Sequence, residues 1–394
     1  MSGRHHLALW RSVSALGVAQ VVSWGSLFYA IGVLGAPMRA ALGIDDVALF
    51  GSFTAGLFVS GIAAPAVGRR IDARGGRGVL AFGSVMAALA CLVLGVSTHA
   101  WHMVAGWLIA GVAMAACLYD PAFAALHRAS GTAYRRAVTV LTLFGGFAST
   151  VFWPLSQYLL DTIGWRHAWL AYAVLHVALC LPLHVAYAPG ALDVERASGD
   201  GSSTHSARFR AHPHAFAWLA TALSLAAFLA TALAAHLIGL LTAGGLAARD
   251  AVLVGSLIGP MQVAGRLMEM AFGTRMRARA VGFLAFGLMA LALLLLPWVG
   301  SVWILAMLFA LVYGWSNGVM TIVRGTVPAE LFGAHGYGEL LGRLARPQFI
   351  AKAIAPVALT FVFVVDPARR IAAATLAAGG VFALVAFARA VRRG

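Results

Sequence analysis

Charge is scarce in this 394-residue chain: 10% of the residues are charged, whereas 61% are hydrophobic. Acidic residues number only 13, and lysine occurs once, as Lys352, so that 27 of the 28 basic residues are arginines. A water-soluble protein cannot bury apolar surface in this proportion, and the lipid bilayer must therefore act as part of its solvent. The composition excludes a soluble protein.

Cysteine is also rare, and Cys91, Cys117 and Cys180 all fall inside apolar runs without metal-ligand spacing. We therefore expect neither disulfides nor a metal site, and we predict no cofactor. The net charge of +15 is scattered over short loops, with no basic face interleaved with aromatic residues, so we predict no binding to nucleic acid.

Runs of about 20 apolar residues suit membrane helices, and the chain contains twelve of them. They predict an all-α integral membrane protein with twelve transmembrane helices in two six-helix halves. The first run is too long for a signal peptide and is read as a retained helix. The predicted spans cover residues 10–35, 47–69, 78–98, 101–125, 136–161, 166–188, 214–242, 250–272, 279–299, 301–325, 341–364 and 368–390.

A polar segment at residues 189–213, rich in Gly, Ser and His, separates the first six spans from the last six. Such a segment cannot bury apolar surface and is typical of a flexible linker. We predict an N-terminal bundle over residues 1–188 and a C-terminal bundle over 214–394. Two similar halves joined by a linker are what a transporter needs if the halves rock about a central site.

The distribution of basic residues predicts the orientation of the chain. With both termini in the cytoplasm, twenty basic residues face the cytoplasm and five face the other side, while three lie within or at the edges of spans. Cytoplasmic loops carry the excess of Lys and Arg. We therefore expect both termini, and the basic loop between the second and third spans, on the cytoplasmic side.

That loop carries the spacing Gly-x3-Asp-x2-Gly-x-Arg on Gly68, Asp72, Gly75 and Arg77. The pattern resembles the loop between helices 2 and 3 of the major facilitator superfamily, although Ala73 and Gly76 stand where that family usually has basic residues. The resemblance implies the twelve-helix fold of that family. It also implies that these motif residues form a conformational latch that holds the two halves in the outward-open state.

A second layer of motifs resembles the monocarboxylate and oxalate/formate branch of the superfamily. In that branch an arginine in helix 8 contacts the substrate carboxylate, and the oxalate carriers add a lysine in helix 11; Arg266 and Lys352 fall in those helices. The resemblance implies a carrier of small organic anions in the bacterial inner membrane, usually monomeric. The motifs are Tyr119-x-Pro121, Arg135-Arg136-Ala137, Gly145-Gly146, Pro154 and Gly164-Trp165-Arg166.

Four ionisable residues lie inside predicted spans, where charge is costly and usually functional: Asp120, Arg266, Glu269 and Lys352. Arg266 and Glu269, three residues apart, share a helix face and form either an internal ion pair or a site in which Arg266 holds a substrate carboxylate. Asp120 either takes up and releases a proton or closes a salt bridge. Lys352 either binds the solute or pairs with an acid.

Neutral polar residues within the spans are the remaining candidates for contact with the solute. Each is also explained by an ordinary hydrogen bond between helices. In the superfamily, helices 1, 4, 7 and 10 line the cavity, which favours those residues that lie in them. The candidates are Gln20, Tyr29, Tyr119, His236 and Asn317.

The sequence thus predicts a secondary transporter that moves a monocarboxylate-like anion by alternating access. Arg266 and Lys352 bind the solute, and Asp120 or Glu269 handles a coupled proton; the expected partners are the solute, protons and the bilayer. One alternative is a proton-driven exporter of cationic or amphiphilic compounds, although helix 5 lacks the Gly-Pro-x2-Gly-Gly signature of drug exporters. The other is a membrane sensor, or an enzyme, that transports nothing.

Overall fold

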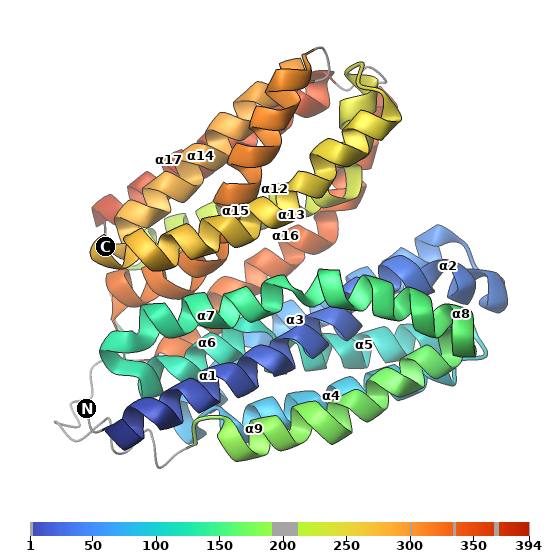
Figure 1. The fold of residues 1–394 in the computed structure, drawn as a ribbon, viewed down its shortest axis with the longest axis vertical. Coiled ribbons are helices and arrows are strands. Elements are labelled where there is room, and N and C mark those ends of the chain that lie inside the picture. The colour runs from blue at the N-terminus through green and yellow to red at the C-terminus, as the bar shows by residue number, and fades with distance from the viewer. Residues whose placement is uncertain (1–2, 191–211, 300–301, 334–335, 366–369, 394) are drawn as a thin grey trace. The chain divides into compact units, whose positions relative to one another are not determined.

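The computed structural model describes residues 3–190, 212–299, 302–333, 336–365 and 370–393 (Figure 1). The secondary structure of these residues is helical, apart from an isolated antiparallel bridge between Gly75 and Gly190. The chain divides into two compact units. Unit 1 holds residues 1–204 and 336–346, and unit 2 holds residues 205–335 and 347–394. The predicted linker, residues 189–213, lies almost wholly outside the described residues.

Unit 1 is a bundle in which α4 packs against both α5 and α8, while α3 packs against α5 and α1 against α7. The glycines of this unit allow close helix contacts: a Cβ on Gly56 would collide with the carbonyl of Trp107. The helices are α1 (Gly3–Trp24), α2 (Ile31–Leu42), α3 (Asp46–Arg74), α4 (Arg77–Gly95), α5 (Ala100–Cys117), α6 (Tyr119–Ser130), α7 (Tyr134–Gly146), α8 (Ala148–Leu175) and α9 (Leu181–Tyr187).

Unit 2 repeats this pattern, with α15 packed against both α13 and α14, and α17 packed against α12 and α14. Here a Cβ on Gly318 would collide with the carbonyl of Gln262, so the backbones of α13 and α15 touch much as those of α3 and α5 do. The helices are α12 (Pro213–Ala243), α13 (Ala248–Phe272), α14 (Ala278–Val299), α15 (Trp303–Phe332), α16 (Tyr337–Val365) and α17 (Arg370–Arg393); α16 begins in unit 1 and continues into unit 2.

Nine helical stretches of the described residues are long and apolar enough to cross a membrane. One of them, Gly131–Tyr187, contains two of the predicted spans, which meet at a kink where Gly164 has a non-helical φ of 78° and ψ of 164°. The helices α13 and α16 are long enough but are not among the nine, and they carry the charges of Arg266, Glu269 and Lys352. The described residues therefore form a multi-helix membrane bundle, and the count of twelve stays a prediction.

Three local features differ from regular spans. The first predicted span contains a π-helical turn, η1 (Gly25–Tyr29), between α1 and α2, and a second π-turn, η3 (His176–Cys180), joins α8 to α9. The fourth predicted span is broken at Leu118, whose ψ of −160° separates α5 from α6. The basic loop is shorter than the sequence suggests, because α3 continues to Arg74 and α4 already starts at Arg77.

Candidate functional site

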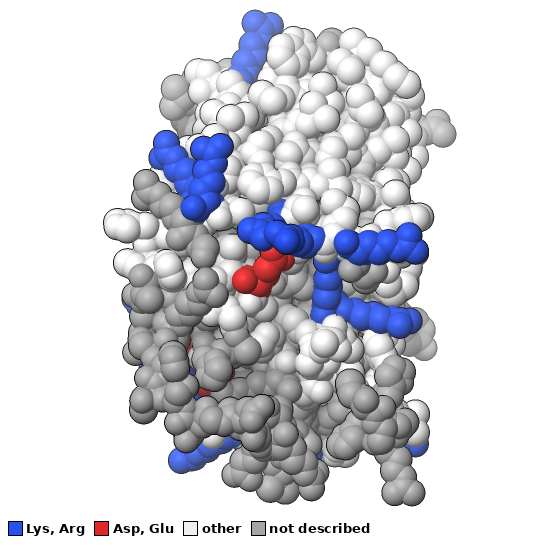
Figure 2. All heavy atoms as spheres, turned by 90° about the vertical axis from the view of Figure 1, so that its left-hand side faces the viewer, with Lys and Arg blue, Asp and Glu red and all other residues white. Residues whose placement is uncertain are grey.

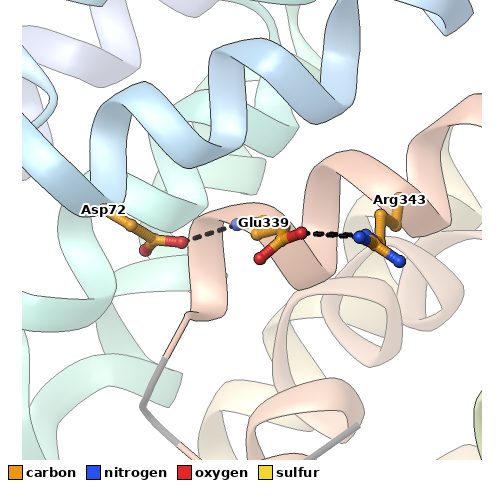
Figure 3. A network of polar contacts seen from close by, with 3 residues as sticks. All are labelled: Asp72, Glu339 and Arg343. Carbon is orange, nitrogen blue, oxygen red and sulfur yellow. Dashed lines mark hydrogen bonds and ion pairs between the residues drawn. The ribbon is translucent and has the colours of Figure 1, made fainter. Parts of the chain in front are cut away.

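The carboxylate of Asp72 caps the beginning of α16 (Figure 3). Its Oδ1 accepts a hydrogen bond from the backbone N–H of Gly338 at 2.8 Å, and its Oδ2 accepts one from Glu339 at 2.7 Å. The first N–H groups of a helix have no partner within the helix and carry partial positive charge, so a carboxylate binds there favourably. Asp72 thus fastens the first turn of α16 to the end of α3.

Glycines make this contact sterically feasible. A Cβ on Gly68 would collide with the carbonyl oxygen of Gly338, and a Cβ on Gly342 would collide with that of Ala64. The two backbones therefore touch one helical turn before Asp72. On α16, Glu339 is held by Arg343, whose Nη2 lies 2.8 Å from its Oε1 (Figure 3). Gly68 and Asp72 act together at this docking contact between α3 and α16.

An aromatic cluster supports the same docking contact from α6 and α7. The hydroxyl groups of Tyr134 and Tyr337 are 3.0 Å apart, and the ring of His127 stacks on that of Tyr337 with centroids 3.9 Å apart. Both tyrosines are buried. The first turn of α16 is therefore fixed to three helices of unit 1: α3, α6 and α7.

The other two motif residues, Gly75 and Arg77, face the end of α9 instead. Nε of Arg77 donates to the carbonyl of Ala188 at 3.0 Å, and the backbone N–H groups of Gly76 and Arg77 both reach the carbonyl of Pro189 at 3.0 Å. Gly75 has φ = 78°, a conformation that favours glycine. This half of the motif closes the turn between α3 and α4 against the end of the first bundle.

Gln20 braces the break in the fourth predicted span. Its Nε2 donates to the carbonyl of Cys117 at 2.7 Å, and its Oε1 accepts from the indole of Trp24 at 3.1 Å. The break at Leu118 leaves carbonyls at the end of α5 without a helical partner, and a buried carbonyl without a hydrogen bond is costly. Gln20 is fully buried, and the structure engages both ends of its amide in this support.

Tyr119 and Asp120 begin α6 immediately after the break, and both are buried. The ring of Tyr119 lies between Trp24 and Phe123, with centroid distances of 5.1 and 5.4 Å. A Cβ on Gly145 would collide with its hydroxyl, so Gly145 is required for this position of the ring. The break thus places an acidic residue in the first turn of a helix, directly after Tyr119 of this aromatic cluster.

In unit 2, Arg266 is buried in α13, with 5% of its surface exposed. Its Nε donates to the carbonyl of Gly318 at 3.4 Å, whereas its Nη1 is buried without a hydrogen-bond partner among the described residues. The missing side chain at Gly318 lets α15 approach closely enough for this contact. A buried guanidinium group with an unused donor is costly in a membrane protein and provides a ready site for an anion.

The remaining candidates of unit 2 lie on α12, α13, α15 and α16. Nε2 of His236 lies 3.0 Å from the carbonyl of Pro356, and Nζ of Lys352 lies 5.2 Å from the ring centroid of Phe349. Glu269 is buried, and Asn317, directly before Gly318, is half-buried.

The described His, Cys, Asp and Glu residues form no group of three or more that could hold a metal ion. The three cysteines are buried and free. Basic side chains are prominent on the face drawn in Figure 2, where acidic side chains are few.

Sequence reasoning identified Asp72 but missed its partners, Gly338 and Glu339. The signal was a glycine-rich helix start, Gly336-Tyr337-Gly338, with Gly342 one turn later. The structure also explains Gly318, directly after the candidate Asn317, by the close packing of α13 and α15. The partner of a capping carboxylate lies 266 residues away, and local patterns do not reveal it.

Comparisons with known proteins agree on the fold. The family model described as Major Facilitator Superfamily matches residues 16–356. The crystal structure of the human organic anion transporter MFSD10 (TETRAN) is similar with a TM-score of 0.73 and 17% identity, covering 96% of this chain and 99% of that one. The proton:xylose symporter XylE, bound to 6-bromo-6-deoxy-D-glucose, is similar with a TM-score of 0.73 and 11% identity, covering 97% and 95%. No curated protein sequence matches this chain.

Proposed function

This chain belongs to the Major Facilitator Superfamily, and we propose that it is a secondary transporter of a small organic anion that works by alternating access. The observation that carries the proposal is the buried Arg266, whose Nη1 has no hydrogen-bond partner among the described residues. A carboxylate that accepts two hydrogen bonds from the guanidinium group would satisfy this donor and neutralise its charge. The carboxylate of the solute would then supply the hydrogen-bond acceptor for Nη1 of Arg266.

Other residues of unit 2 support a site for an anion. Lys352 contributes a second positive charge on α16, and Asn317 and His236 offer polar groups on α15 and α12. In unit 1, Tyr29, Tyr119 and Gln20 remain proposed contacts, with Gln20 acting through its support of the broken span. The name of the human relative, an organic anion transporter, agrees with this substrate class.

Proton coupling is the second part of the proposal. Asp120 and Glu269 are buried acids within membrane helices, and such residues commonly mark proton pathways. Asp120 stands in the first turn after a broken helix, and irregular backbone at membrane depth is tolerated where it is buried in protein or lines a water-filled cavity. We assign proton uptake and release to these two residues; the neighbouring fold of a proton:xylose symporter is compatible with that role.

The third part concerns the docking contact of α16. Asp72, aided by Gly68, is proposed to act as a latch that stabilises the outward-open state, while Gly75 and Arg77 hold the turn that presents it. Release of the first turn of α16 would free a helix that continues into unit 2. We also propose a bacterial inner-membrane location and a monomeric carrier.

A thermal-shift screen tests the assignment of the anion site. The purified protein is titrated with formate, lactate, oxalate and succinate, and with tetraphenylphosphonium as a lipophilic cation. A ligand that binds only the native state stabilises it by about 2.7 kcal/mol at a hundredfold excess over its dissociation constant. We expect stabilisation by at least one carboxylate, and loss of that stabilisation in Arg266→Gln and in Lys352→Gln.

The matched control is Arg279→Gln, which removes a half-exposed arginine of unit 2 paired with Glu330 at 3.1 Å. It should leave the carboxylate shift unchanged. The proposal is contradicted, and the exporter favoured, if only the cation stabilises the protein. The same holds if the thermal shift caused by a carboxylate is unchanged in both Arg266→Gln and Lys352→Gln.

A further inference from the structure

Unit 1 contains a cavity whose lining residues are not among the proposed contacts of the anion. It lies between α2 and α8, and its volume is about 570 Å³. Ligand pockets commonly occupy about 300–1,000 Å³. None of its lining residues is charged: Gly32, Val33, Thr150, Trp153, Pro154 and Gln157.

The indole of Trp153 forms one wall of this cavity. The side chain is 51% exposed, and its ring meets Tyr29 edge to face, with centroids 5.9 Å apart and an interplanar angle of 82°. This edge contact orients the indole while its surface stays accessible. Gly32 lies beside the edge of the indole, where a Cβ would make an ordinary van der Waals contact 3.7 Å from Nε1 of Trp153. A side chain larger than alanine at this lining position would extend into the cavity.

A π-helical turn brings this wall together. The turn η1 ends at Tyr29 and adds one residue to the helix, which rotates every later side chain by about 100° around the axis. Without it, Tyr29 and Gly32 would not both face α8. Such turns occur frequently at functional sites.

A buried hydrogen bond fixes the π-turn in place. Ser26 donates to the carbonyl of Val22 at 2.7 Å, and its Oγ lies 2.8 Å from Nε2 of His176, the first residue of the second π-turn. Both side chains are fully buried. The irregular backbone behind the cavity is thus held from two helices, and its geometry is preorganised.

Polar groups at the rim define which ligand would fit. Thr150, Trp153 and Gln157 are spaced by three and four residues and lie on one face of α8. Nε2 of Gln157 donates to Asp161 at 2.9 Å, which orients the amide. The hydroxyl, the indole N–H and the amide can hydrogen-bond to a substituent, while an aromatic surface favours a flat ring by about 0.5–1.5 kcal/mol beyond burial.

From this geometry we propose that the cavity of unit 1 binds a flat, uncharged aromatic molecule that carries a hydrogen-bonding substituent. The lining residues carry no charge, and the neighbouring carboxylate of Asp161 is already hydrogen-bonded to Gln157, which disfavours an ionic group at this position. A lipid chain, which is flexible and saturated, would gain little from an oriented indole.

Equilibrium dialysis against the protein in lipid nanodiscs tests this proposal with two radiolabelled amides. Benzamide and cyclohexanecarboxamide share the same polar group and ring size, but only benzamide is flat. We expect saturable binding of benzamide and about tenfold weaker binding of the saturated amide, which corresponds to about 1.4 kcal/mol. Trp153→Leu should abolish the preference, and Gly32→Leu, which fills the cavity, should abolish binding.

The matched control is Trp101→Leu, which removes an indole that is 64% exposed on α5, away from the cavity. It should leave the binding of both amides unchanged. If Trp153→Leu does not fold, Trp153→Phe retains a ring and should retain the preference. Equal binding of the two amides, which marks a lipid-type groove, overturns the proposal, as does benzamide binding that survives Gly32→Leu.

Discussion

The docking contact between Asp72 and α16 gives the sharpest prediction from the structure. In Asp72→Asn the side chain keeps its shape but loses its charge, and its amide oxygen replaces only one of the two accepting oxygens. Hydrogen bonds to a charged group contribute about 1.5–3 kcal/mol, against about 0.5–1.5 kcal/mol for neutral ones. Together with the lost attraction to the helix terminus, the docked state should weaken by about 2 kcal/mol.

That change corresponds to about a 30-fold shift between docked and released α16, since about 1.4 kcal/mol is tenfold. Hydrogen–deuterium exchange measures it directly at the backbone N–H groups of Gly338 and Glu339, which the carboxylate protects. We expect exchange in residues 336–346 to accelerate by about this factor, wherever exchange requires release of α16.

The same substitution at Asp45 supplies the control. Asp45 caps the other end of α3 through Oδ1, which accepts from the N–H of Ala48 at 2.7 Å. Asn is about as good a cap as Asp at that position, so Asp45→Asn should leave exchange in residues 336–346 unchanged. Unaltered exchange in Asp72→Asn, or equal acceleration in both variants, would refute the role assigned to the carboxylate.

Two further substitutions test the internal supports of the candidate site. Gln20→Leu removes the hydrogen-bond partner of the Cys117 carbonyl and of the Trp24 indole N–H, and should lower the free energy of unfolding by about 1–3 kcal/mol. Thermal denaturation in detergent measures this loss. Unchanged stability would contradict the bracing role of Gln20. Gly318→Ala forces a methyl group against the carbonyl of Gln262 and displaces the carbonyl that Arg266 contacts, so carboxylate affinity should fall about tenfold in the thermal-shift titration. Gly259→Ala on α13, where a Cβ meets nothing within 4 Å, should leave the affinity unchanged and should not lower stability, because Ala has the higher helix propensity. Equal losses of affinity in the two alanine variants would refute the packing argument.

The sequence predicted the helical membrane class because apolar runs of span length are a strong local signal. It predicted the motif at Gly68 and Asp72 because glycine and a capping acid have specific backbone roles. It missed the two π-turns and the break at Leu118, since their cause lies in distant partners. Gln20, for example, satisfies a carbonyl 97 residues later in the chain.

In the candidate site, too, local signals could be predicted from the sequence and long-range contacts could not. Arg266 and Lys352 stood out in the sequence as rare charges within apolar runs. The contact of Arg266 with the Gly318 carbonyl could not be predicted, because it depends on how closely α13 and α15 pack.

Flux through proteoliposomes tests the central claim most directly. Vesicles that contain the protein, with an imposed pH gradient, are supplied with the radiolabelled carboxylate that gives the largest thermal shift, and uptake is compared for the unmodified protein, Arg266→Gln and Arg279→Gln. The account predicts saturable uptake that is driven by the pH gradient and is retained in Arg279→Gln. In Arg266→Gln, uptake should fall by at least about a hundredfold, because the bound carboxylate loses its bidentate charged partner and with it about 3 kcal/mol of binding free energy. Uptake that Arg266→Gln leaves intact, or no carboxylate flux from a protein that carries cations, would contradict it.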